Sequence, residues 1–281
     1  MVDGAILAAR HSFMPNHLGY CGPENNDMLF ESCISNKRTE QLVDALRGFQ
    51  AAYPYLRFIA ESLGAEDPLD YRAVEAYWIG NDFLQKISPG DFYDHLKARF
   101  KAKFPKEHIK KLFEAQTFAP FPHHALHVFN AFSTMGTVPE SFASGAGPDE
   151  MVGGLMDKCR ISWGRVLEAD ENGNLIVEYE PVRRLNGKLY LGKPAPTKVQ
   201  AQFQEKSFVE GAKAGDWISF HWGFACTILT PTQVTNLRKY TLSDMALANA
   251  VPVPQYRRGY GVMSDPDGVR IPPHHSLRLE N

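Results

Sequence analysis

Hydrophobic positions in the first half of the chain recur at helical spacing. Leu42, Ala45, Leu46 and Phe49 stand at i, i+3, i+4 and i+7, the pattern of an amphipathic helix. Several prolines stand where a helix would begin, and the first turn of a helix tolerates their missing N–H: Pro54, Pro68, Pro89 and Pro105. The pattern predicts helices near residues 4–13, 39–49, 54–63, 68–79, 89–103, 105–116 and 118–132. Because the connections are short, we expect an antiparallel all-α bundle over residues 1–135.

The hydrophobic period changes from helical to strand-like after Cys159. Leu175, Val177 and Tyr179 alternate with polar positions, and Asn186-Gly187 is a strong hairpin signal. The pattern predicts five or six short antiparallel strands, and a small barrel is the economical way to remove their edges. A capping box at Thr230–Gln233 begins a further helix.

These patterns together predict an α+β fold of two domains. A helical bundle (1–135) is followed by a linker rich in glycine and proline (136–156), and then by a β-barrel with a C-terminal helix (157–250). A proline-rich extended tail (251–281) ends the chain.

Composition excludes several classes of function. The 281 residues are 44% apolar and 22% charged, as in ordinary globular proteins, and the net charge of −2 argues against nucleic acid or a membrane surface as the main partner. No apolar run reaches the roughly 18 residues of a membrane span, so a cytoplasmic location is expected. Four scattered cysteines form no C-x-x-C, and phosphate-loop and dinucleotide motifs are lacking.

Two short motifs in the second half carry a resemblance. Residues 159–166 read Cys-Arg-Ile-Ser-Trp-Gly-Arg-Val, and residues 215–225 read Gly-Asp-Trp-Ile-Ser-Phe-His-Trp-Gly-Phe-Ala. In these motifs the segment 158–244 resembles the HypC/HupF family of nickel–iron hydrogenase maturation chaperones. In that family the first motif opens the domain and the second contains its histidine.

The resemblance implies an OB-like β-barrel that helps to assemble an iron centre carrying carbon monoxide and cyanide ligands. Cys159 and His221 would contact the iron, and a larger protein of the metallocentre-assembly machinery would be the partner. Thiolate and imidazole are suitable ligands for iron. Without the resemblance, Cys159 is better explained as a small buried side chain and His221 as a hydrogen-bonded structural histidine.

A second candidate site lies on the last predicted helix of the bundle. His123 and His127 stand at i and i+4 and His124 and His127 at i and i+3, spacings at which two imidazoles can chelate a transition metal. The competing interpretation is a polar helix start that packs against the tail.

A third candidate is the glycine-rich loop that follows the first helix. Its vicinity carries His11, His17 and Cys21, residue types typical of a metal site, although their spacing matches no motif. A purely structural loop is the alternative. If the loop met the histidine helix, one metal site would form from residues of both: His11, His17, His123 and His127.

Three functional hypotheses follow. The first is a metallochaperone that binds or transfers an iron fragment through Cys159 and His221. The second is an iron-dependent enzyme that uses histidines of the N-terminal domain, for example to make a small ligand for a metallocentre. The third is a protein-interaction module without metal.

Overall fold

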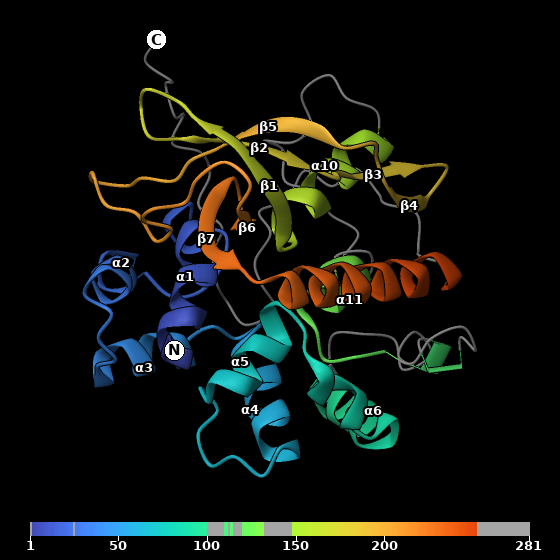
Figure 1. Cartoon of the computed structure of the whole chain (residues 1–281). Coiled ribbons are helices and arrows are strands. Elements are labelled where there is room, and N and C mark those ends of the chain that lie inside the picture. The colour runs from blue at the N-terminus through green and yellow to red at the C-terminus, as the bar shows by residue number, and fades with distance from the viewer. Residues whose placement is uncertain are drawn as a thin grey trace.

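The computed structural model describes residues 2–24, 26–99, 110–111, 113–114, 120–131 and 148–251 (Figure 1). Its helices are α1 (Gly4–His17), α2 (Asn26–Ser35), α3 (Glu40–Arg47), α4 (Tyr53–Ser62), α5 (Tyr71–Trp78), the 3-10 helix η1 (Asp82–Lys86), α6 (Pro89–Arg99), α8 (His124–Leu126), the π-helix η2 (His127–Ala131), α10 (Pro148–Cys159) and α11 (Pro231–Ala250). Its strands are β1 (Ser162–Ala169), β2 (Leu175–Tyr179), β3 (Val182–Leu185), β4 (Lys188–Leu191), β5 (Ala195–Val199), β6 (Trp217–His221) and β7 (Phe224–Leu229).

The predicted α+β class is confirmed. The amphipathic helix α3 buries Leu42, Ala45 and Leu46, and Thr39 caps it by accepting the Leu42 N–H. The capping box at Thr230 and Gln233 begins α11 as predicted. Within the described ranges, every helix is too short or too polar to cross a membrane.

The strands form one five-stranded antiparallel sheet, ordered β5-β2-β1-β6-β7, and the separate hairpin β3-β4. The hairpin turns at Asn186 and Gly187, both with positive φ, as the sequence predicts. The edge strands of the sheet approach each other at a parallel bridge between Gln200 and Phe224. The closed, OB-like barrel stays a prediction.

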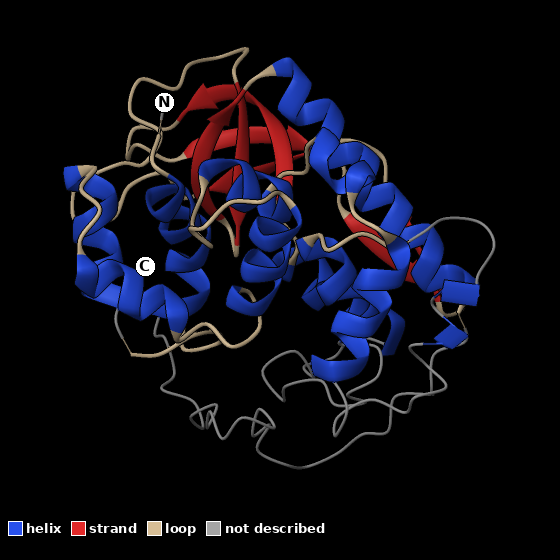
Figure 2. Cartoon of the chain, turned by 90° about the horizontal axis from the view of Figure 1, so that it is seen from below, coloured by secondary structure: helices blue, strands red, loops and turns tan. Residues whose placement is uncertain are grey.

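One hydrophobic core joins the helical and β segments. The largest cluster of buried side chains contains Phe13 of α1, Trp163 of β1, Phe224 of β7 and Tyr240 of α11. Helix α1 is buried along most of its length, and Figure 2 shows helices packed beneath the strongly curved strands. The start of β1 and the end of β6 are therefore buried against the helices.

Two expectations at the junction need correction. The linker expected at 136–156 is helical from residue 148, where α10 begins with Asp149 and Glu150 in its first turn. Its Gly153 serves packing, because a Cβ on this residue would meet the backbone of Arg184 at 2.9 Å. The helix expected at 118–132 is instead the short α8 followed by the π-helix η2.

Some expected segments fall outside the described residues. These are the linker residues 136–147, the tail beyond residue 251, and most of the helix expected at 105–116.

Candidate metal centre

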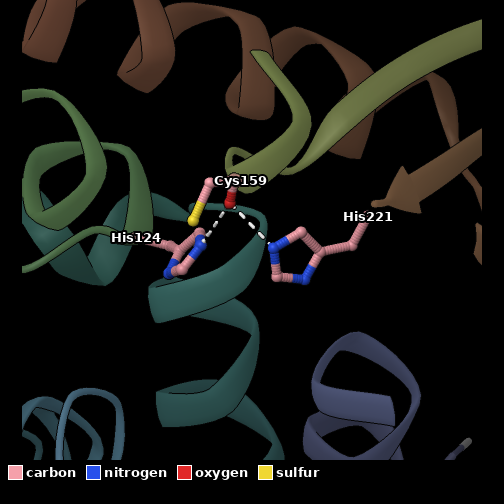
Figure 3. Close-up of side chains that lie close together, drawn as sticks. All are labelled: His124, Cys159 and His221. Carbon is pink, nitrogen blue, oxygen red and sulfur yellow. Dashed lines mark hydrogen bonds between the residues drawn. The ribbon is translucent and has the colours of Figure 1, made fainter. Parts of the chain in front are cut away.

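Side chains from three separate segments converge beneath the sheet (Figure 3). They are His124 at the start of α8, Cys159 at the end of α10 and His221 at the end of β6. One ligand atom from each lies within 4.8 Å of the other two. Both histidines are almost fully buried, with 7% and 3% of their surface exposed, and Cys159 is half-buried. The described residues thus contain a possible His-Cys-His arrangement for a metal ion.

The end of α10 explains why the two rings meet. The last carbonyls of a helix have no intrahelical donor. The carbonyl of Cys159 lies 2.9 Å from Nε2 of His124 and 2.8 Å from Nε2 of His221, while the preceding carbonyl, of Lys158, accepts the N–H of Trp222. The helix dipole places partial negative charge at this end, which favours a bound cation.

The second ring nitrogen of His221 faces another carbonyl. Nδ1 lies 2.6 Å from the backbone oxygen of His11. Burial lowers the pKa of His221 to about 4, although its two hydrogen bonds to backbone groups oppose this, so the ring is neutral at pH 7. A neutral imidazole has one N–H. Only one of the two carbonyl contacts can therefore be an N–H donation. We assign the proton to the shorter one, to His11, which leaves the lone pair of Nε2 facing the Cys159 end of the site.

His124 also has both ring nitrogens engaged, but its Nε2 donates to the carbonyl of Cys159 and its Nδ1 can accept from a hydroxyl. Its Nδ1 lies 3.2 Å from the hydroxyl of Tyr77, and its ring packs against Trp78 at 4.6 Å. Burial, and next the charge of His221, lower the pKa of His124 well below 6.5, so this ring is also neutral. Metal-binding histidines generally engage their other nitrogen with an oxygen atom in this way, which fixes the ring and its tautomer.

The thiol of Cys159 is protonated at neutral pH. Burial raises its pKa, nearby Cys21 raises it further, and hydrogen bonding from the side chain of Trp222 lowers it. A bound cation would offset the cost of burying the thiolate and displace the proton. Trp222 in turn stacks on Tyr20, with ring centroids 4.2 Å apart, so the glycine-rich loop after α1 covers this side of the thiol.

The helix predicted to carry a histidine pair has another geometry. His123 is the extended N-cap of α8, not part of its first turn, and its Nδ1 lies 3.0 Å from buried Asp244. His127 lies in the π-helix and packs edge-on against Tyr55. The i, i+4 face on which the pair depends is therefore not formed. His124, between them, is the one that reaches Cys159.

The residues of the first loop are also distributed differently from the expectation. Both ring nitrogens of His11 are engaged, by the carbonyl of Leu7 and the hydroxyl of Ser219, so His11 meets the site through its backbone oxygen. His17 is exposed and packs on Phe13. Among the described residues, the expected grouping of His11, His17, His123 and His127 does not occur.

Comparison with known proteins gives one result for the chain as a whole. No curated protein and no solved structure matches it. A family model matches residues 1–255, a span that includes the helical segment, the sheet and all three residues of the candidate metal centre. The chain therefore belongs to the family of unknown function DUF6390.

Proposed function

We propose that the protein is a metal-binding accessory protein that holds an iron ion or iron fragment between His124 Nε2, Cys159 Sγ and His221 Nε2. The observation that supports this most strongly is the convergence of three ligand atoms within 4.8 Å. The Nδ1 atoms of both rings are at the same time engaged by oxygen atoms outside the group. A purely structural role, in which two histidines cap the end of α10, would explain the positions of the two rings. It would not explain why the thiol of Cys159 lies beside them.

The donor set favours a transition metal. Thiolate and imidazole suit iron, zinc and copper, whereas magnesium and calcium take oxygen ligands. Three protein ligands leave a coordination position for an external ligand or for a donor from a partner. That open position is what a protein that receives and passes on a metal fragment needs.

Among these metals, iron is the one that the resemblance to the HypC/HupF chaperones implies. Cys159 and His221 occupy the matching positions, and His124 adds a third ligand from the helical segment. We expect transfer of the fragment to a cytoplasmic protein of the metallocentre-assembly machinery.

The test is anaerobic purification followed by metal analysis and infrared spectroscopy. We expect one iron per chain, and bands of iron-bound carbon monoxide or cyanide if the fragment carries these ligands. His124→Ala, Cys159→Ala and His221→Gln each lose the metal, while exposed His17→Gln keeps it. An unmodified protein that stays metal-free after anaerobic incubation with ferrous iron would contradict the proposal.

A metal-dependent enzyme is the second candidate. One ligand, His124, comes from the helical segment, and the open coordination position could accept a substrate. The two candidates differ in the fate of the metal. A chaperone loses its iron to an acceptor protein, whereas an enzyme retains it through repeated turnovers.

A further inference from the structure

A proline in α1 stands at the position that controls the carbonyl bound by His221. Pro15 lies inside the helix, where residue i normally donates its N–H to the carbonyl of residue i−4. Proline has no N–H, so it gives no such bond to the carbonyl of His11. That same oxygen lies 2.6 Å from Nδ1 of His221, across 210 positions of the chain.

A proline inside a continuous helix, as at Pro15, is unusual. Proline is the residue least suited to the interior of a helix, yet α1 continues through Pro15 to His17 and is buried on nearly every side. The packing of α1 against the sheet holds the helix together here. The helical hydrogen bond to the carbonyl of His11 is therefore missing where that carbonyl contacts a residue of another element, His221 of β6.

The consequence reaches the ligand atom of His221. With the His11 carbonyl available, Nδ1 keeps the single ring proton and Nε2 offers its lone pair. If residue 15 carried an N–H, that group would compete for the same oxygen. The ring would then favour a proton on Nε2, donated to the carbonyl of Cys159 at 2.8 Å, and that proton would stand where a metal must bind.

We propose that Pro15 is a positioning residue of the metal centre, which fixes the tautomer of His221 by leaving the carbonyl of His11 open. This inference rests on the proposed metal-binding function. On this inference, Pro15 costs α1 one backbone hydrogen bond and in return orients the ring of His221 for metal binding.

The test compares Pro15→Ala and Pro15→Gly in the full chain, with cobalt(II) as the metal probe. Both variants restore the N–H, but alanine favours the helix and glycine does not. We expect both to weaken cobalt binding by about 10- to 100-fold, the usual effect of losing an outer partner of a metal ligand. Pro54→Ala, which changes a proline in the first turn of α4, is the matched control and keeps the original affinity.

A second measurement follows the tautomer directly in the metal-free protein. Nitrogen-15 NMR of the His221 ring should show the proton on Nδ1 in the unmodified protein and a shift toward Nε2 in both variants. The inference is overturned if both variants keep the original tautomer and the original cobalt affinity. It is also overturned if only Pro15→Gly loses affinity, because the loss would then follow helix stability rather than the restored N–H. If the unmodified protein binds no cobalt, the metal function fails, while the tautomer measurement still decides the role of Pro15.

Discussion

Acidification should unfold this protein at mild pH, because several buried histidines must stay neutral in the fold. Burial lowers the pKa of His11 to about 3 and of His221 to about 4, and lowers that of His124 well below its ordinary value of 6.5. In the unfolded chain all three regain the ordinary value. Between these values the unfolded state binds more protons than the folded state, so stability is complete above about pH 7 and is lost as the pH falls.

The size of the effect follows from the shifts. At about pH 5, each histidine that is protonated only when unfolded lowers the free energy of unfolding by about 2 kcal/mol, so the three together lower it by about 6 kcal/mol. Asp244 acts in the opposite direction, because burial raises its pKa to about 6 and the folded state takes up a proton first. Its contribution recovers about 1 kcal/mol. The net loss of about 5 kcal/mol is comparable to the whole stability of many domains.

Urea unfolding of chelator-treated protein, followed by circular dichroism between about pH 7.5 and about pH 5, measures this loss. His11→Gln should reduce the pH-dependent part by about 2 kcal/mol, whatever it does to the stability at neutral pH. His17→Gln, a substitution at an exposed histidine, is the matched control. A free energy of unfolding that changes by less than about 1 kcal/mol over this range would refute the reasoning.

Three further substitutions test other parts of the structure. Asp157→Ala removes the carboxylate that faces fully buried Arg160, and should lower the free energy of unfolding by about 3–5 kcal/mol in a urea titration. Trp222→Asn keeps a residue that tolerates the positive φ of 53° but removes the indole from the thiol of Cys159. Alkylation of that thiol, followed by peptide mass spectrometry, should be about tenfold faster in this variant, and an unchanged rate would exclude a covering role. Gly164→Ala should cost about 1–3 kcal/mol in thermal unfolding, because its Cβ would meet a β2 side chain at 2.2 Å.

The sequence predicted those parts of the fold that depend on local pattern. Helix α3 follows from hydrophobic spacing and its Thr39 cap, and the β3–β4 hairpin follows from Asn186-Gly187. The sequence failed where glycine serves packing rather than a loop. Gly153 lies in α10 because the helix approaches the backbone of β3 too closely for a Cβ. Nothing local distinguishes this use of glycine from a flexible linker.

The candidate site was predictable only in part. The resemblance points to Cys159 and His221, and no spacing rule connects them. The sequence offers His124 only as a neighbour of His127 at i+3, since its approach to Cys159 depends on packing between distant segments. Charge and hydrophobic periodicity predict neither the contact between His124 and Cys159 nor the backbone carbonyl that a buried imidazole will contact. Those contacts are set by tertiary structure.

The wide separation of the three ligands along the chain has a consequence for how the protein would behave in the laboratory. His124 and Cys159 are 35 positions apart, and Cys159 and His221 are 62 positions apart. An ion held by all three would cross-link the chain and restrict the unfolded state, much as a disulfide that closes a long loop does. The apparent melting temperature would then report metal loading as well as sequence. Two preparations of the same chain with different metal contents would therefore have different melting temperatures.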